Sequence, residues 1–119
     1  MFIEMCKSKI QPAVVTATEL FYEGSITVDR ALMDAVDILP YERVHVLNLN
    51  NGARMETYTI EGESNSGVIC LNGAAARLAE PGDKVIILSY CTIEKEKAVG
   101  WKPSIVIVDE QNKISKKLL

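Results

Sequence analysis

The sequence predicts a mainly β domain with short helices, closed into a small barrel with two similar halves. Three observations predict it. The chain has 119 residues, of which 48% are hydrophobic but only 6% aromatic, so Val and Ile dominate the expected core. Asn51-Gly52 lies between two alternating segments, which indicates a hairpin. A strand, helix, turn, strand pattern occurs twice. The length suits one domain spanning residues 1–119.

The N-terminal quarter of the chain is predicted to form three strands, at residues 2–6, 12–17 and 25–28, and the second contains Val14, Val15 and Thr16. Lys7-Ser8-Lys9 is expected to be a basic connection between the first two strands. From composition alone, both lysines would be solvated surface residues.

Asp29 is a natural N-cap for a short helix over residues 30–36. The predicted hairpin strands follow at residues 44–49 and 55–60. Side chains two apart share a face of a strand, so Arg54 and Tyr58 are expected to point one way and Thr57 the other. By this reasoning Arg54 and Tyr58 can reach one pocket, and Thr57 joins it only through a local twist or a pocket that touches both faces.

The second half of the chain continues with a loop, a strand at residues 68–71, a small-residue helix at 74–79 and a strand at 84–90. Residues 39–46 and 80–87 align at a constant offset, with Pro40 matching Pro81 and the acidic, basic and apolar positions coinciding. A charged turn at residues 94–97 and a strand at 104–108 come next. We expect residues 111–119 to form a mobile tail.

Composition excludes several classes of protein. A net charge of −3 does not favour nucleic-acid binding. The N-terminus resembles no signal peptide and no segment is long and apolar enough to cross a membrane, so the expected location is the cytoplasm. The three cysteines are expected to be reduced, and the one histidine, His45, excludes a multi-histidine metal site and argues against a Ser-His-Asp triad.

The run Tyr22-Glu23-Gly24-Ser25 lies between two predicted strands and is, from composition alone, an ordinary turn. A sharper hypothesis is self-cleavage. Ser25 Oγ could attack the carbonyl carbon of Gly24, which has no side chain to block the approach. Elimination of Gly24 as a carboxylate, followed by loss of ammonia, would leave a pyruvoyl group at residue 25.

Several segments together resemble the pyruvoyl-dependent aspartate decarboxylase family. They are residues 22–26 with Asp29, Asn51-Gly52, residues 54–58 and residues 72–76. The resemblance runs from the N-terminus to about Pro103. It implies a six-stranded double-psi β-barrel that cleaves itself between Gly24 and Ser25 into a β chain (1–24) and an α chain (25–119).

The resemblance also implies the reaction and the partners of the protein. The reaction is decarboxylation of L-aspartate at its α-carboxylate to β-alanine and CO2, for pantothenate biosynthesis. The cofactor is the built-in pyruvoyl group, with no metal and no pyridoxal phosphate. The assembly is a homotetramer with active sites at subunit interfaces, and a maturation factor is a further partner that cleavage could require. No nucleic acid and no membrane is expected as a partner.

The resemblance assigns residues to the chemistry. Ser25 supplies the pyruvoyl group that forms a Schiff base with the substrate, Tyr58 donates a proton, and Gly24 and Thr57 join Ser25 in processing. The substrate-binding residues it implies are Lys9, Arg54, Thr57, Asn72, Gly73, Ala74, Ala75 and Tyr22. Arg54 offers a planar fork for a carboxylate and Lys9 a compact point charge.

Plainer readings remain open for several of these residues. Tyr58 could be a cross-strand packing residue and Tyr22 a core or interface aromatic. Gln11 stands where related enzymes often have His, and Leu47 where some have Trp, which puts substrate positioning and processing rate in doubt. Two alternative functions stay open: an unprocessed barrel that serves as a binding or assembly module, and a pyruvoyl decarboxylase of another acidic amino acid such as glutamate.

Overall fold

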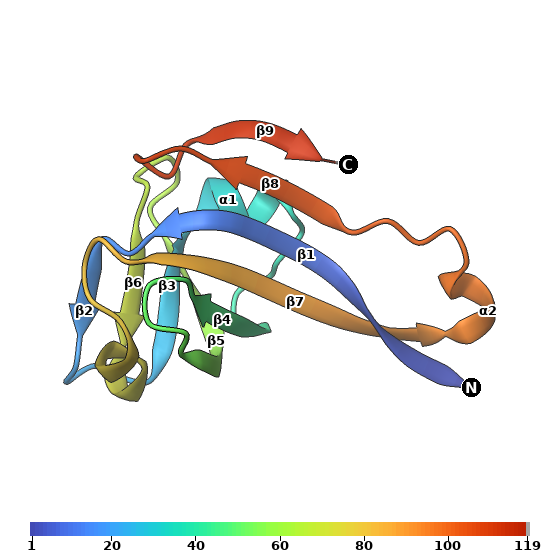
Figure 1. The fold of residues 1–119 in the computed structure, drawn as a ribbon, viewed down its shortest axis with the longest axis horizontal. Coiled ribbons are helices and arrows are strands. Elements are labelled where there is room, and N and C mark those ends of the chain that lie inside the picture. The colour runs from blue at the N-terminus through green and yellow to red at the C-terminus, as the bar shows by residue number, and fades with distance from the viewer. Residues whose placement is uncertain (119) are drawn as a thin grey trace.

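The computed structural model describes residues 1–118, in which nine strands form one sheet in the order β2-β6-β3-β5-β4-β7-β1-β8-β9 (Figure 1). The strands are β1 (Phe2–Val14), β2 (Ala17–Glu19), β3 (Ser25–Asp29), β4 (Arg43–Asn48), β5 (Arg54–Gly62), β6 (Ile69–Asn72), β7 (Lys84–Glu94), β8 (Ser104–Val108) and β9 (Ile114–Leu118). The helical segments are α1 (Arg30–Ala35), the 3-10 helix η1 (Gly73–Leu78) and α2 (Lys95–Ala98). The mainly β prediction is confirmed. Of the eight strand segments that the sequence pattern predicts, the first two fall in β1, and β2 and β9 were not predicted.

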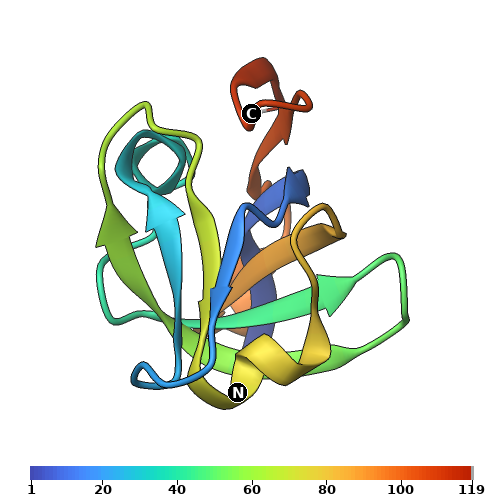
Figure 2. The same cartoon turned by 90° about the vertical axis from the view of Figure 1, so that its left-hand side faces the viewer.

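The sheet curls on itself because β1 continues directly into β2, which pairs in parallel with β6 at the far end of the strand order (Figure 2). Thr16, between β1 and β2, strengthens this closure: its backbone N–H donates to the Ile69 carbonyl at 2.8 Å, and its Oγ1 accepts from the Ile69 N–H at 3.0 Å. β8 and β9 extend the sheet beyond β1, and β2 is a three-residue strand that the sequence pattern does not reveal.

The predicted connection at Lys7-Ser8-Lys9 is wrong, because β1 runs without a break from Phe2 to Val14. It pairs antiparallel with β7 and parallel with β8, and irregularities in the pairing with β7 fall between Cys6 and Ser8 and between Ile10 and Ala13. Ser8 and Ile10 are fully buried, whereas the two lysines are partly exposed. The basic residues are therefore the outward half of an alternating strand.

The two predicted halves are confirmed in the backbone. Tyr41 and Gly82, which correspond in the repeat, both have positive φ, 70° and 94°. Their N–H groups make matching hydrogen bonds of 2.8 Å, from Tyr41 to the Thr59 carbonyl and from Gly82 to the Val15 carbonyl. Each turn therefore attaches through an equivalent hydrogen bond, one to β5 and the other to the residue that follows β1.

The core lies where these halves meet. Val46 of β4 and Ile87 of β7 are equivalent positions, and they are also direct partners in the antiparallel β4–β7 pair. Both side chains are fully buried, as are Ile26 of β3 and Leu71 of β6, which face each other across another antiparallel pair. Aliphatic side chains thus fill the barrel, as the composition indicates.

The predicted helix after β3 is confirmed, with Asp29 as its cap. The Asp29 carboxylate is buried and accepts from three backbone N–H groups: Ala31 at 2.8 Å, Asn65 at 2.9 Å and Gly67 at 2.8 Å. One side chain therefore satisfies the start of α1 and also fixes the loop before β6. This anchors the C-terminal end of β3, whose other end is Ser25.

The C-terminal residues differ from the expected mobile tail. Ile114–Leu118 form β9, antiparallel to β8. Asn112 is buried, and its Nδ2 donates to the carbonyls of Val14 and Gly67, each at 2.8 Å. These two hydrogen bonds attach the turn before β9 to the barrel. Leu119 lies outside the described residues.

Among the described residues, no helix has the length and the apolar character that crossing a bilayer requires.

Candidate active site

Ser25 is the first residue of β3 and is completely buried. Its Oγ donates to the Glu23 carbonyl at 3.0 Å and accepts from Asn72 Nδ2 at 3.0 Å. A buried hydroxyl held by two partners has a fixed direction, which a solvated turn serine lacks. The environment of Ser25 therefore differs from that of an ordinary, solvated turn serine.

Gly24 lies between open space and a close backbone contact. A Cβ on Gly24 would meet no heavy atom within 4 Å, so one side of the residue is unobstructed. On another side it packs against Gly73, the first residue of η1, which has φ +66°. A Cβ on Gly73 would lie 2.7 Å from both Cα and N of Gly24 and 2.8 Å from the Tyr22 carbonyl oxygen. Glycine at residue 73 lets η1 approach the turn this closely.

A cavity of about 440 Å³ opens beside Gly24. Five of the expected site residues line it, Gly24, Thr57, Tyr58, Ala74 and Ala75, together with Met55, Glu56 and Leu78. The methyl side chains of Ala74 and Ala75 leave this space beside the start of η1 open. Met55, Glu56 and Leu78 were not expected here, since apolar and acidic side chains on a strand or helix carry no specific sequence signal.

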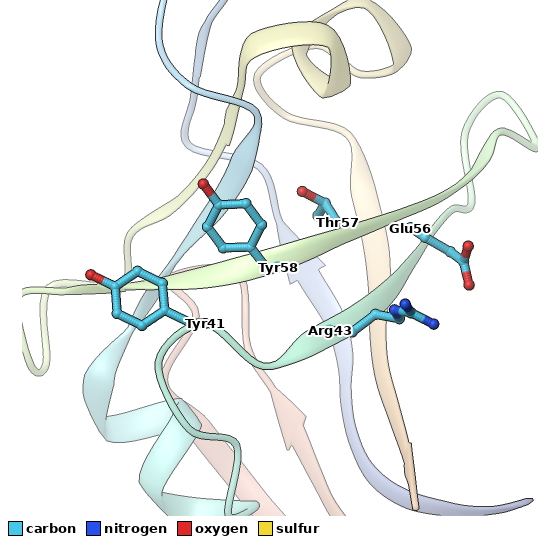
Figure 3. A pocket seen from close by; sticks show the side chains of 5 residues that line it. All are labelled: Tyr41, Arg43, Glu56, Thr57 and Tyr58. Carbon is cyan, nitrogen blue, oxygen red and sulfur yellow. The ribbon is translucent and has the colours of Figure 1, made fainter.

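Thr57 and Tyr58 both line this cavity although they are adjacent in β5. They also line a neighbouring hollow of about 550 Å³ with Tyr41, Arg43 and Glu56. In Figure 3 the hydroxyl groups of Thr57 and Tyr58 extend to the same side of the β5 ribbon, away from Arg43. Thr57 and Tyr58 therefore reach one cavity although simple alternation turns them apart. Tyr41 packs against Tyr58, with ring centroids 6.2 Å apart.

Arg54 does not share a cavity with Tyr58, in contrast to the expectation. Arg54 lines a separate hollow of about 700 Å³ with Glu4, Arg43, His45, Glu56 and Tyr90. The two residues lie on one face of β5 about 13 Å apart along the extended strand, and Tyr58 lines an adjoining hollow that shares Arg43 and Glu56 with that of Arg54. The spacing predicted the shared face of the strand correctly, but the two residues line different hollows.

Lys9 lies on the same outer face as Arg54. In the sheet register Lys9 is opposite Leu88, Leu88 is opposite His45, and His45 is opposite Glu56. Directly opposed residues point to the same side of a sheet, and Arg54 is two residues from Glu56 on that side. We define these positions on β1, β7, β4 and β5 as the outer sheet face. Neither Lys9 nor Arg54 lines the cavity beside Gly24.

The charges on this face are unevenly paired. His45 Nε2 lies 3.1 Å from Glu56 Oε1, and the His45 ring meets Tyr90 edge-on at a centroid distance of 5.2 Å. Within residues 1–118, no ion pair involves Lys9 or Arg54. Both cations are therefore available to an anionic partner from outside the chain.

Tyr22 and Asn72 complete the expected set. Tyr22 is 57% exposed in the turn before Gly24, and it approaches the site through its carbonyl oxygen. Asn72 is buried at the end of β6, and its side chain makes no capping bond to η1 but contacts Ser25 and Thr27 instead. Among residues 1–118, no cluster of His, Cys, Asp and Glu side chains is arranged to hold a metal ion.

The sequence of the chain matches the family described as aspartate decarboxylase over residues 1–115. The chain belongs to this family. The matched region contains every residue of the site described above.

Individual relatives agree with the family assignment. The protein named aspartate 1-decarboxylase from Carboxydothermus hydrogenoformans is 58% identical over 116 residues, which is 98% of this chain and 91% of the relative. The one from Pelotomaculum thermopropionicum is 59% identical over 96% of this chain and 86% of its own length. The one from Clostridium acetobutylicum is 56% identical over 97% and 91%.

Proposed function

We propose that the chain cuts itself between Gly24 and Ser25 and then decarboxylates L-aspartate at its α-carboxylate to give β-alanine, the precursor used for pantothenate. The observation that carries the proposal is the buried Ser25 hydroxyl, held by Asn72 and Glu23 beside the open approach to Gly24. It occurs in a chain 58% identical to a protein named aspartate 1-decarboxylase.

Self-cleavage begins with attack of Ser25 Oγ on the Gly24 carbonyl carbon, which forms an ester bond and breaks the peptide bond, while the hydroxyl proton passes to the released Ser25 nitrogen. Removal of the Ser25 Cα proton then breaks the Cβ–Oγ bond and releases Gly24 as a carboxylate. The remaining dehydroalanine takes up one water and loses one ammonia, and a keto group stays at residue 25. Thr57 Oγ1, at the cavity wall beside Gly24, is suited to stabilise the oxyanion of the attack.

The surroundings of residue 25 fit a small neutral keto group. The position is buried and its neighbours are polar but uncharged, with Asn72 Nδ2 already directed at the residue 25 oxygen at 3.0 Å. The pyruvoyl group supplies a carbonyl that takes up the substrate amine and accepts the electron pair left when CO2 departs. The small side chains of Ala74 and Ala75 leave room for the substrate in the adjacent cavity.

Substrate capture requires cations, because aspartate carries two carboxylates. We propose that Lys9 and Arg54 reach the cavity from a second copy, in a homotetramer whose sites lie between subunits. In one chain both lie on the outer sheet face without ion-pair partners among the described residues, and neither lines the cavity. Tyr22, Thr57 and residues 72–75 would contact the substrate from the copy that carries Ser25.

Mixed oligomers test this sharing. A Ser25→Ala chain has an intact Arg54, and an Arg54→Ala chain has an intact Ser25. The Ser25→Ala chain alone should be inactive. The Arg54→Ala chain alone should have decarboxylase activity lowered about 10- to 100-fold, the range for loss of a charged hydrogen bond. Their co-expressed mixture should regain activity well above both. Co-expression of Ser25→Ala with Tyr58→Phe is the matched control and should gain nothing, because both residues belong to the same copy's cavity. Activity of the first mixture at or below the mean of its components would contradict the shared site.

Tyr58 is the proposed proton donor to the former α-carbon after CO2 leaves. It lines the cavity, and its hydroxyl extends toward the side occupied by Thr57 (Figure 3). Tyr58→Phe should therefore leave cleavage intact and lower kcat for aspartate by about 10²- to 10⁴-fold, the usual contribution of general acid catalysis. Mass spectrometry follows cleavage and β-alanine release follows kcat. Normal turnover in this variant would remove Tyr58 from the mechanism.

An intact mass spectrum under denaturing conditions tests the proposed function itself. We expect two species, residues 1–24 and residues 25–119, the second lighter by one ammonia than the same chain with an N-terminal serine. A single uncut mass that persists on prolonged warming, with no turnover, would favour a binding or assembly module. Parallel assays with aspartate and glutamate decide the substrate, and faster turnover of glutamate would overturn the choice of aspartate.

A further inference from the structure

Four polar side chains share one face of β3 and β6. We define Ser25, Thr27, Cys70 and Asn72 as the polar quartet. In the antiparallel β3–β6 register Ser25 is opposite Asn72 and Thr27 is opposite Cys70, so all four point to the same side of the sheet. Residues between them, such as Ile26 and Leu71, point into the core instead. The quartet therefore includes Ser25, the residue that follows the proposed cleavage bond, and the side chains next to it on the sheet.

Asn72 is the centre of the quartet, and both Nδ2 and Oδ1 of its amide have partners within it. Nδ2 donates to Ser25 Oγ at 3.0 Å and to Thr27 Oγ1 at 3.0 Å. Oδ1 accepts from the Cys70 thiol, with Sγ at 3.3 Å. Asn72 is 2% exposed and Cys70 is 8% exposed, so solvent competes little for these groups.

The opposite orientation of the amide is disfavoured at both ends. If the amide were turned over, Oδ1 would face Ser25 and Thr27, and the Ser25 hydroxyl would have to give up its bond to the Glu23 carbonyl to donate to it. At the other side of the group the Cys70 thiol, which offers a hydrogen to Oδ1, would lose this acceptor. Burial raises the pKa of the Cys70 thiol, and the nearby Glu19 carboxylate acts in the same direction, so the donor keeps its proton.

The orientation matters for the first step of cleavage. With N–H directed at Ser25 Oγ, the amide stabilises negative charge that develops on Oγ as its proton leaves. The Ser25 hydroxyl then donates to the Glu23 carbonyl at 3.0 Å. In the turned-over orientation, Oδ1 would accept the hydroxyl hydrogen and oppose that charge.

We propose that Cys70 is a positioning residue for self-cleavage: its S–H holds the Asn72 amide so that Nδ2 faces Ser25 Oγ. The inference rests on the proposed self-cleavage and adds a residue that the resemblance does not assign to it. Thr27 supports the same orientation by accepting the second Nδ2 hydrogen.

The test compares Cys70→Ser with Cys70→Ala. Serine keeps a donor of similar size, whereas alanine removes it. Uncut chain made by cell-free synthesis is incubated, and denaturing mass spectrometry follows the rate of cleavage. Cys70→Ser should cleave within about threefold of the wild type, and Cys70→Ala about tenfold more slowly, as expected for one lost buried hydrogen bond. Thermal unfolding of each chain in a Ser25→Ala background, which stays uncut, separates this effect from a general loss of stability.

Several outcomes would overturn the inference. Equal cleavage rates for the two variants, fast or slow, would show that the donor is not what matters at residue 70. If Cys70→Ala does not fold, Cys70→Val, which refills the volume without a donor, replaces it in the comparison with Cys70→Ser. A wild-type chain that never cleaves would remove the proposed function together with this inference, whereas a cleaving wild type with equal variants would remove the inference alone.

Discussion

Ser25→Ala should remain a single full-length chain and show no decarboxylation at all. Alanine has no oxygen on Cβ, so neither the attack on Gly24 nor the later elimination can occur. The fold should survive, because the residue loses only the hydrogen bonds of Oγ to Glu23 and Asn72. We expect a loss of roughly 1–3 kcal/mol in the free energy of unfolding, because Asn72 Nδ2 keeps its bond to Thr27. Denaturing mass spectrometry measures the loss of cleavage, and a β-alanine assay measures the loss of decarboxylation.

Ser115→Ala is the matched control. Ser115 lies on the exposed strand β9, and its Oγ donates to the Ile107 carbonyl at 3.1 Å, far along the chain from Gly24. This variant should cleave and turn over as the wild type does. A Ser25→Ala chain that still separates into two fragments would disprove attack by the Ser25 hydroxyl.

Gly73→Ala should block or strongly slow cleavage. The residue has φ +66°, and an added Cβ would lie 2.7 Å from Cα and N of Gly24, so η1 and the turn must move apart. The positive φ alone costs about 1–3 kcal/mol for a non-glycine residue, and the clash adds to it. Movement of Gly24 changes the angle at which Ser25 Oγ approaches its carbonyl carbon. Cleavage rate and thermal unfolding are the measurements, and we expect at least a tenfold slower rate.

Gly100→Ala separates the two causes. Gly100 also has positive φ, +82°, but a Cβ there would meet nothing within 4 Å. It should lose a similar amount of stability through backbone strain and cleave at the normal rate. If Gly73→Ala cleaves as fast as Gly100→Ala, the contact between Gly73 and Gly24 has no role in processing.

Much of the fold was readable from local sequence. Asp29 at the start of α1 and the Asn51-Gly52 hairpin obey short-range rules, and Gly52 has the expected φ of +76°. The predicted repeat is also present in the structure, because Tyr41 and Gly82 make equivalent turns. The errors came from β1, where outward lysines on a long strand look like a connection, and from the C-terminal residues, which depend on the distant contacts of Asn112.

The sequence and its family resemblance name candidate site residues but do not give their arrangement. The resemblance named Thr57 and Tyr58, and the structure brings both to one cavity with Gly24. It could not show that Arg54 lies in a different hollow, because spacing fixes the face of a strand and not the reach of a pocket. Cys70 went unnoticed because its contact with Asn72 depends on side-chain packing at the β3–β6 register, which no local pattern reveals.

The path of β1 decides what cleavage does to the molecule as a whole. The segment ahead of Gly24 contains β1 and β2, and β1 is hydrogen-bonded to β7 on one side and β8 on the other. A cut at Gly24 therefore leaves the two pieces joined by sheet pairing and core contacts, with no covalent link between them. Folding from the cut state becomes a reaction between two molecules, and its equilibrium depends on protein concentration. On the proposed route the chain folds before the cut, while its two parts are still tethered, and the cut protein keeps an architecture that would assemble less readily from its separated pieces.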